Sequence, residues 1–436
     1  MKKAFLLLAS LFGIVSLAGQ THTIKIHEDG RVASLLMTPT EYSDWKTKNE
    51  FKKDETVSEN LFKDIYKKFT DDFDFIFLVL NESEKPANLA FGRLWKISNA
   101  TTGLKLDLYD NSFFYGSSGK LQSIIQLSQL DFLTSGPSLH ELFHNWGNYG
   151  IPTRTVPFGN NVASEEKDFK THWGFTGGSS RGQLGGFDQN TLIDNGSNSY
   201  TVNSFGTFAN GGNNIPYNEL ELYLMGLIPI SEVSDFNTFS GISSFTDNDN
   251  GTFNFTASKK KTYTPESLEA LLGPREPKNT SSQKNFKSLV IVLTDTPLTT
   301  AEWNLINTDA EKFSRNSSDG TESYNFWEAT NGLATLEMDN LQGAILSVDE
   351  PSFNQKNIAI YPNPTNKTLT IDLNNSDISV DTVLLINSLG VTVTNLKISN
   401  NKMALNIDLS NYSPGHYSLQ IKNKSGVLIT KKIVVY

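Results

Sequence analysis

The sequence predicts a mixed α/β (α+β) domain followed by a small all-β sandwich. Within residues 19–345, apolar residues at helical spacing alternate with short apolar runs, such as residues 73–80, that are typical of buried strands. Residues 346–356 are polar and have the composition of a linker. Residues 357–436 contain short alternating segments with turn signals about every 8 to 12 residues, which is typical of an antiparallel sandwich.

Residues 1–18 have the organisation of a secretory signal peptide. Lys2 and Lys3 form a basic start, residues 5–15 form an apolar run too short to span a bilayer, and small residues follow it. No later segment approaches the roughly 18 apolar residues of a membrane helix, so we expect no membrane span. The chain contains no Cys, so an exported fold of this length would depend on core burial and not on disulfides.

The segment that precedes residue 136 predicts a helix and three strands. The capping-box pattern Thr56-x-x-Glu59 stands before apolar residues at helical spacing. The run 73–80, which is apolar apart from Asp74, predicts a central strand that is covered on both faces. Residues 104–109 and 121–127 are further strand candidates. We expect residues 121–127 to form the edge of a cleft, where an extended peptide can pair by strand addition.

The most informative motif is His-Glu-x-x-His, formed by His140, Glu141 and His144. Residues four apart lie on one face of a helix, so both imidazoles can reach the same metal ion, while Glu141 lies beside the open coordination position. Zinc takes His nitrogens at about 2.0 to 2.1 Å and lowers the pKa of its water toward about 7, so that a neighbouring carboxylate can take the proton. The alternative is a buried amphipathic helix whose two histidines are ordinary core residues.

The residues around the motif predict the limits of its helix. Pro137 suits the first turn, where its missing N–H costs nothing, and Gly147 suits a left-handed C-terminal position. We therefore expect a helix of about ten residues between them.

A catalytic zinc site needs a third protein ligand, and His172 is the first candidate. The chain has six histidines and no Cys, which excludes a thiolate ligand. His22 and His27 lie next to the expected mature N-terminus, and His416 lies in the C-terminal segment.

Carboxylates are the alternative third ligand. Glu165 and Glu166 follow His144 at nearly the spacing with which zinc proteases of the thermolysin type supply a glutamate, although their neighbours have the composition of a solvated loop. If a carboxylate is the ligand, His172 is a surface histidine stacked on Trp173.

Residues 140–147 read His-Glu-x-x-His-x-x-Gly and resemble the opening of the metzincin zinc-protease signature. The compact signature would place the third histidine at position 150, which is Gly150 here. The chain is similar instead to the leishmanolysin-like variation, in which an insertion delays the third ligand, and this resemblance implies that His172 is that ligand. Residues 222–229 resemble the methionine turn beneath the zinc, with Met225 as its methionine. The resemblance implies a zincin-like α/β catalytic domain.

Residues 150–216 are rich in Gly, Asn and Ser, which predicts hairpins and loops of the kind that carry substrate pockets. Asn195-Gly196 is the clearest hairpin turn. Residues 247–251 read Asp-Asn-Asp-Asn-Gly and favour a hairpin turn, with a calcium loop as the alternative.

Residues 264–302 predict two helices that begin at Thr264 and Thr299, with a strand at residues 289–293 between them. We expect this part to form a lower subdomain that closes the cleft from beneath.

The C-terminal segment contains three distinctive short motifs. Residues 361–364 read Tyr-Pro-Asn-Pro, residues 415–417 read Gly-His-Tyr, and residues 432–435 read Lys-Ile-Val-Val. The segment resembles the sorting domain that the type IX secretion system of Bacteroidetes recognises. The resemblance implies transport across the outer membrane, followed by removal of the domain or attachment to the cell surface. The alternative is an ordinary carbohydrate-binding or spacer sandwich.

Together these features predict a secreted zinc metalloendopeptidase that hydrolyses extracellular proteins, with Glu141 as general base and His140, His144 and His172 as zinc ligands. The alternatives are a non-catalytic adhesin or binding module that retains the metal helix, and a zinc hydrolase of a non-peptide bond. The expected partners are a protein or peptide substrate and the type IX machinery. A net charge of −10 disfavours nucleic acid, and we expect a monomer.

Overall fold

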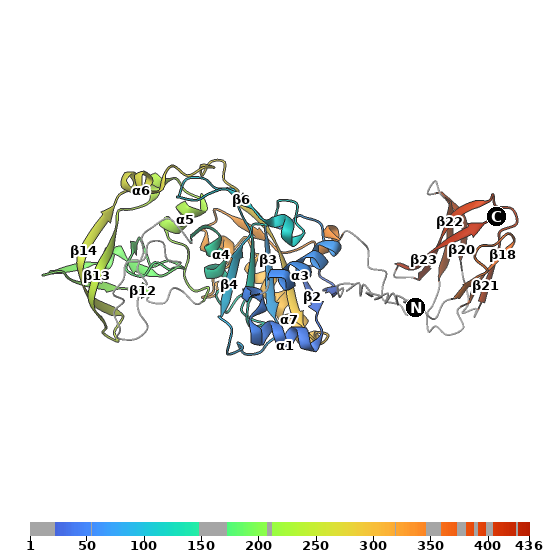
Figure 1. Cartoon of the computed structure of the whole chain (residues 1–436), viewed down its shortest axis with the longest axis horizontal. Helices are drawn as coiled ribbons and strands as arrows, with labels where there is room; N and C mark the ends of the chain where they lie inside the picture. The colour runs from blue at the N-terminus through green and yellow to red at the C-terminus, as the bar shows by residue number, and fades with distance from the viewer. Residues whose placement is uncertain are drawn as a thin grey trace, which may run out of the picture. The chain divides into compact units, whose positions relative to one another are not determined.

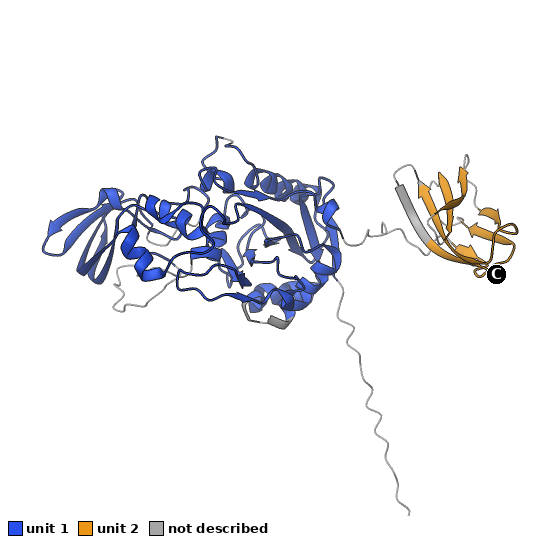
Figure 2. Cartoon of the chain, turned by 90° about the horizontal axis from the view of Figure 1, so that it is seen from above, with its two compact units in different colours: residues 1–346 blue, residues 347–436 orange. Residues whose placement is uncertain are grey.

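The computed structural model describes residues 22–53, 55–147, 172–206, 212–318, 320–345, 359–372, 381–387, 391–397, 404–423 and 426–436. The expected signal peptide lies outside these residues. The chain divides into two compact units, residues 1–346 and 347–436 (Figure 1; Figure 2).

The main sheet of the first unit has the strand order β1-β2-β15-β3-β7-β4, and β16 also pairs with β15. Its strands are β1 (Thr23–Ile26), β2 (Val32–Leu36), β3 (Phe75–Leu80), β4 (Gly92–Lys96), β7 (Ser123–Leu127), β15 (Asn285–Thr294) and β16 (Thr335–Glu337). β2, β15, β3 and β7 run parallel, whereas β1 and β4 pair antiparallel at the two ends. The mixed α/β architecture is the one that the sequence predicts.

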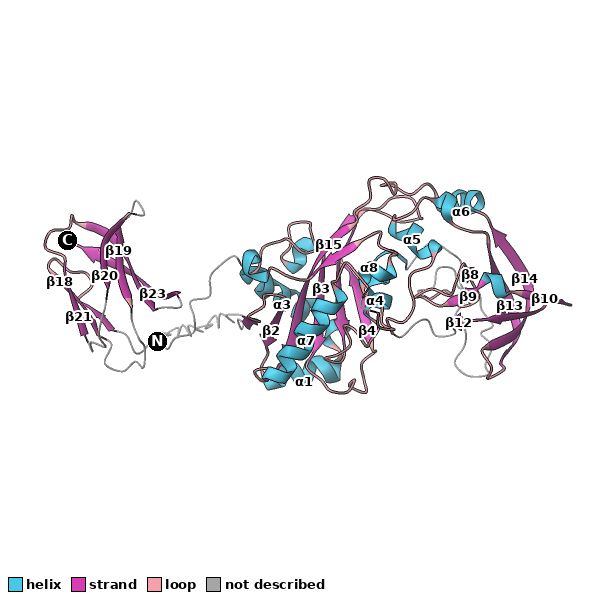
Figure 3. Cartoon of the chain, turned by 180° about the vertical axis from the view of Figure 1, so that it is seen from behind, coloured by secondary structure: helices cyan, strands magenta, loops and turns pink. Residues whose placement is uncertain are grey.

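Helices cover both faces of this sheet (Figure 3). In β3, Phe75, Phe77 and Val79 belong to one core, and the alternate residues of the strand belong to a second core. The first core takes apolar residues from α4 (Ser138–Gly147), α5 (Glu219–Met225), α6 (Pro265–Leu272), α7 (Thr300–Phe313) and α8 (Phe326–Ala329). The second takes residues from α1 (Pro39–Lys48), α2 (Glu50–Lys53) and α3 (Glu55–Lys68). Because both faces are covered, β3 is apolar throughout, as predicted.

One strand prediction in this region is wrong, and a second predicted strand is present but does not lie at the expected edge. Residues 104–109 do not form a strand, since Leu104 and Lys105 adopt positive φ angles of 53° and 55°. Only the short β6 (Tyr109–Asp110) follows, paired with β5 (Ser98–Asn99). Residues 121–127 do contain a strand, β7, but it lies between β3 and β4 and is fully buried, so it is not an edge. The edge strand is β4.

The expected lower subdomain is also a wrong prediction. The helices that begin after Thr264 and Thr299 are present as α6 and α7, and each has a capping box at its start. The strand between them, however, is β15, which pairs with β2 on one side and β3 on the other. Ten consecutive residues of β15, mostly buried, suit an internal position in a sheet covered on both faces.

Residues 172–263 build a second, aromatic-rich region of the first unit. One sheet has the order β10-β11-β14-β13 and a small one has the order β12-β9-β8. These strands are β8 (Gly177–Gly178), β9 (Gly186–Asp188), β10 (Ile193–Gly196), β11 (Ser199–Asn203), β12 (Phe205–Gly206), β13 (Phe236–Asp247) and β14 (Thr252–Tyr263). A hairpin joins β10 to β11, but its turn lies at Ser197 and Asn198, which adopt positive φ angles of 51° and 63°. Asn195 and Gly196 are the last residues of β10, so the turn predicted there is displaced by two residues. Residues 247–251 close the β13–β14 hairpin, so that turn prediction is confirmed.

The second unit is a two-sheet sandwich with the strand orders β17-β18-β21 and β20-β19-β22-β23. Its strands are β17 (Ala359–Tyr361), β18 (Thr368–Asp372), β19 (Thr382–Asn387), β20 (Thr392–Lys397), β21 (Ala404–Asp408), β22 (Gly415–Asn423) and β23 (Gly426–Val435). Buried residues of both sheets, such as Ile371 and Leu419, form one core. The C-terminal β-rich prediction is therefore confirmed.

Candidate metal centre

Helix α4 carries the His-Glu-x-x-His motif, and every one of its ten residues is buried. The helix begins directly after Pro137, whose carbonyl accepts the Glu141 N–H at 2.8 Å. Asn213 fixes this end: its Oδ1 accepts the Leu139 N–H at 3.0 Å, and its Nδ2 donates to Ser138 Oγ at 2.8 Å. The predicted length and start of the helix are confirmed.

Gly147 does not act as the left-handed stop that the sequence predicts. It is the last residue of α4 and does not have a positive φ. A Cβ at this position would lie 2.1 Å from the Phe143 ring. Glycine is therefore suited to this site by the close packing of an aromatic ring one turn earlier, and not by backbone conformation.

Three imidazole rings converge above α4. His140 Nε2 lies 3.2 Å from His144 Nε2 and 3.2 Å from His172 Nε2. The three rings therefore offer one ligand atom each within 4.8 Å of one another. The structure thus brings together the three histidines that sequence reasoning selected, although His172 lies 28 residues after His144 (172 minus 144).

The tautomer of His140 is fixed by a backbone carbonyl. His140 Nδ1 lies 2.7 Å from Gln183 O, which can only accept, so Nδ1 carries the hydrogen and Nε2 presents its lone pair. Burial, together with the neighbouring His172, lowers the pKa of His140 to about 4 against the raising effect of the Gln183 hydrogen bond. Burial also lowers the pKa of His172. Neutral imidazoles are the form that binds metal ions.

The donor set fits zinc. Two nitrogens bound to one tetrahedral zinc at about 2.0 to 2.1 Å would lie about 3.3 to 3.4 Å apart, which is close to the 3.2 Å spacings between the Nε2 atoms. Three neutral imidazoles leave a fourth position open, as in catalytic sites. His140, His144 and His172 are therefore the residues that would hold the ion, and their role as ligands stays a prediction.

The carbonyl that orients His140 is itself held by a buried carboxylate. Glu221, on α5, accepts the Leu184 N–H through Oε1 at 3.0 Å and the Asn218 N–H through Oε2 at 3.1 Å. A backbone hydrogen bond also links Glu221 to Gln183. Burial raises the pKa of Glu221 to about 7 against these hydrogen bonds. Glu221 thus connects the start of α5 to the segment that faces the histidines.

Glu141 points toward the edge strand β4. The Leu94 backbone N–H donates to its carboxylate, and Arg93 lies near enough to favour the charged form. Burial outweighs both effects and raises the pKa of Glu141 to about 8. A cation bound by the neighbouring histidines would lower this pKa, because positive charge favours the carboxylate.

Three other predicted features have different outcomes. Met225 is buried, but it is the last residue of α5, and the turn follows at Gly226, which has a φ of 77°. The methionine therefore ends a helix that packs against α4 and does not lie within a turn. Glu165 and Glu166, the alternative ligands, lie outside the described residues. Trp173 is buried and packs edge-on against Phe143, so it is not a surface ring.

Sequence reasoning missed three contributors to this site. Gln183 acts through its backbone carbonyl, so its side-chain type carries no signal. Glu221 resembles any capping-box residue, since it does cap α5. Gly92 could have been found, because a glycine within a strand often marks a close approach by another group.

Comparison with known families identifies one part of the chain. Residues 359–436 match the secretion system C-terminal sorting domain. The second unit is a type IX sorting domain. The sorting-domain prediction is thus confirmed, and the carbohydrate-binding or spacer alternative is set aside. A search of the curated proteins finds no match to this chain.

The sorting domain determines where the protein goes. It directs export across the outer membrane to the cell surface or the medium, and it implies interaction with the type IX secretion machinery. Within the described ranges, no helix is both long and apolar enough to cross a membrane.

Proposed function

We propose that residues 19–345 form a zincin-like catalytic domain that acts as a zinc-dependent metalloendopeptidase on extracellular proteins. The observation that carries the proposal is the convergence of three His Nε2 atoms, two of them 3.2 Å from the third, beside a buried glutamate on the same helix. A purely structural metal site would have no use for Glu141, whereas peptide hydrolysis needs a base at that position.

The residues of the site have distinct roles in this mechanism. Zinc, when bound, supplies a Lewis acid for the scissile carbonyl and makes water more acidic. Glu141 takes the proton of the attacking water and then gives it to the leaving amine, so the C–N bond breaks without net change in the enzyme. The Leu94 N–H orients the Glu141 carboxylate, and the Gln183 carbonyl orients His140.

The edge strand β4 is the proposed docking site for the peptide. β4 pairs with β7 on one side, and among the described residues no strand pairs with its other side. An extended peptide can add to such an edge through main-chain hydrogen bonds. Gly92 of β4 lies against Glu141, so a peptide on this edge would pass the proposed base.

The test is Glu141→Gln with Glu232→Gln as a control, because Glu232 is exposed and belongs to a different element. We expect near-stoichiometric zinc in the wild type and in both variants. Casein cleavage should fall by about 100-fold or more in Glu141→Gln, since general acid–base catalysis contributes about 10²- to 10⁴-fold.

Retained cleavage in Glu141→Gln would contradict the mechanism. Zinc in the wild type without turnover of casein or of simple esters would favour the binding-module alternative. Turnover of esters alone would favour a hydrolase of a non-peptide bond.

A further inference from the structure

A cavity of about 360 Å³ lies at the end of the main sheet where β3, β7 and β15 begin. The strand β4 ends at the same place with Lys96, and Asn145 and Trp146 at the end of α4 form part of the wall. The volume is in the range of sites for small ligands. The proposed function makes no use of this cavity.

The charged residues that line the cavity are Lys96, Lys120, Arg275 and Asp74. Three cations and one anion give an excess of two positive charges (3 − 1 = 2), although the whole chain has a net charge of −10. A local excess of positive charge in an acidic protein favours an anionic ligand.

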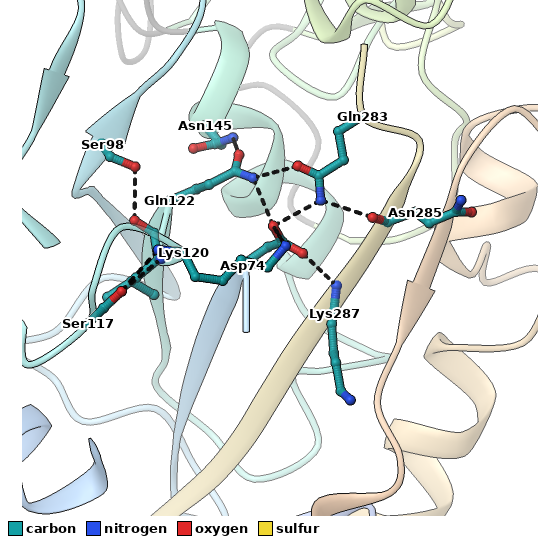
Figure 4. Close-up of polar contacts among 10 residues, drawn as sticks. Asp74, Ser98, Ser117, Lys120, Gln122, Asn145, Gln283, Asn285 and Lys287 are labelled. Atoms are coloured by element: carbon teal, nitrogen blue, oxygen red, sulfur yellow. Dashed lines mark hydrogen bonds and ion pairs between the residues drawn. The ribbon is translucent and has the colours of Figure 1, made fainter. Parts of the chain in front are cut away.

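Asp74 is already used by the protein. Its Oδ1 lies 2.9 Å from Lys120 Nζ and accepts from Gln122 Nε2 at 3.0 Å and Gln283 Nε2 at 2.9 Å, while the Lys287 N–H donates to Oδ2 at 2.9 Å. Figure 4 shows these groups directed toward the Asp74 carboxylate. The charge of Lys120 is thus neutralised by Asp74. The Asp74 carboxylate, which already accepts these four contacts, is not available to neutralise a second cation.

Arg275 is also occupied, but by neutral groups. Its Nε donates to Leu224 O at 3.2 Å and its Nη2 to Met225 O at 3.2 Å, which satisfies carbonyls at the end of α5. Its Nη1 donates to Pro277 O and to Ser282 Oγ. Arg275 therefore keeps its positive charge while most of its N–H groups are used.

Lys96 is the cation that remains available. Its Nζ has three N–H donors and, among the described parts of the chain, makes one hydrogen bond, to Asn99 Oδ1 at 3.2 Å. Among the described residues, no carboxylate lies within ion-pair distance of Lys96. Partial burial, together with repulsion from Arg275, lowers the pKa of Lys96 to about 8. A half-buried ammonium without a carboxylate beside it is stabilised when an anion joins it.

The rest of the cavity suits a ligand with an apolar body. Trp146, Met225 and Phe286 all line it, and the rings of Trp146 and Phe286 pack edge to face with centroids 5.5 Å apart. An inorganic anion would leave this apolar surface without a partner, whereas an organic acid would cover it.

We propose that this cavity binds an organic carboxylate, with Lys96 Nζ paired to the carboxylate and the aromatic residues covering its carbon skeleton. The carboxylate has two possible sources, a small free acid or an acidic group of a peptide. Both present the same chemistry to Lys96.

The first test is calorimetric binding of glutarate and of benzoate to the exported chain at fixed ionic strength, with 1,10-phenanthroline present so that a metal ion makes no contribution. We expect one of these acids to bind the wild type and to bind Lys96→Met about tenfold more weakly or worse, because a hydrogen bond to a charged group is lost. Lys259→Met, which removes an exposed lysine on β14, should bind as the wild type does.

A second arm distinguishes the two sources. Three hexapeptides with blocked termini are compared: one with a single Glu, one with Gln in its place, and the Gln peptide with a free C-terminal carboxylate. Binding that is restricted to the acid-bearing peptides assigns a peptide ligand, and binding of glutarate or benzoate alone assigns a free acid. Either result supports the proposal, while equal binding of the uncharged Gln peptide contradicts it.

Thermal unfolding separates a binding role for Lys96 from a structural one. Without ligand, Lys96→Met should melt at the wild-type temperature or above it, because a half-buried charge with no carboxylate partner has been removed. A melting temperature several degrees lower would make Lys96 a structural residue and overturn the proposal. The proposal would also be overturned if neither the free acids nor the acid-bearing peptides bound the wild type more than a chloride control does. Because the metal is chelated in all of these binding measurements, a negative result would contradict the carboxylate site without bearing on the proposed peptidase activity.

Discussion

Gly92 on the edge strand is packed directly against Glu141 on α4. A Cβ at Gly92 would lie 2.5 Å from Glu141 Cγ, 2.9 Å from Glu141 Oε1 and 2.9 Å from Pro137 Cγ. The absence of a side chain at Gly92 is therefore what lets β4 and the proposed base approach each other.

Gly92→Ala should displace Glu141 without removing a metal ligand. We expect a fall in kcat with zinc content unchanged, and a loss of about 1 to 3 kcal/mol in the free energy of unfolding, which is usual for an overpacked site. The control is Gly212→Ala, because among the residues that the structure describes a Cβ there would meet only Ser135 O, at 3.8 Å. Full activity of Gly92→Ala would show that the Glu141 position is not critical.

His172→Ala should test the third ligand. Removing one of three imidazoles would lower zinc affinity, so we expect zinc per purified chain to fall well below that of the wild type, together with casein cleavage. His416→Ala, which changes a histidine of the sorting domain, serves as the control. If His172→Ala retained its zinc, the third ligand would instead be assigned to a carboxylate such as Glu165 or Glu166.

Hydrogen exchange should locate the peptide. If a substrate-like peptide inhibitor adds as a strand to β4, backbone amides in Gly92–Lys96 should become protected by the inhibitor. Amides of β7 already lie inside the sheet and should exchange slowly with or without it. Protection that changes elsewhere but not in β4 would contradict the proposed docking edge.

The local features of the site were accessible from the sequence because each depends on neighbouring residues. The spacing of His140 and His144 is set by one helical turn, and the apolar run of β3 reports burial on both faces. The order of strands depends instead on pairing between distant segments. β7 reads Ser-Ile-Ile-Gln-Leu, and its two polar side chains are buried because Ser123 donates to Asn145 and Gln126 accepts from Trp45, partners that the local pattern does not reveal.

Other parts of the site depend on backbone geometry that side-chain types do not report. Residues 104–108 alternate between leucine and a charged residue, as a strand would. Leu104 and Lys105 nevertheless adopt left-handed conformations, which leucine and lysine seldom show. Gln183 contributes a carbonyl, and any residue has one. Trp173, next to His172, donates its N–H to Leu184 O, and the Leu184 N–H donates to Glu221 of α5, so the position of this segment depends on residues far along the chain.

The buried Glu221 should give the protein a pH-dependent stability. Its folded pKa of about 7 lies above the ordinary value of 4.5, so between these values the folded state binds more protons than the unfolded state. By linkage, the contribution of Glu221 to the free energy of unfolding then decreases as the pH rises from about 5 to about 8.

Glu221→Gln removes this titration while it keeps one of the two acceptors. The variant should be less stable by about 1 to 3 kcal/mol, since its amide cannot accept both the Leu184 and Asn218 N–H groups. Chemical unfolding of metal-free protein at pH 5, 6, 7 and 8 measures both effects, and Glu232→Gln is the exposed control. The dependence of unfolding free energy on pH should be weaker in the variant by the part that Glu221 contributes. Zinc affinity should also fall, because the peptide group that carries the Gln183 carbonyl loses a hydrogen bond to Glu221. An identical pH slope in wild type and variant would mean that Glu221 titrates outside this range.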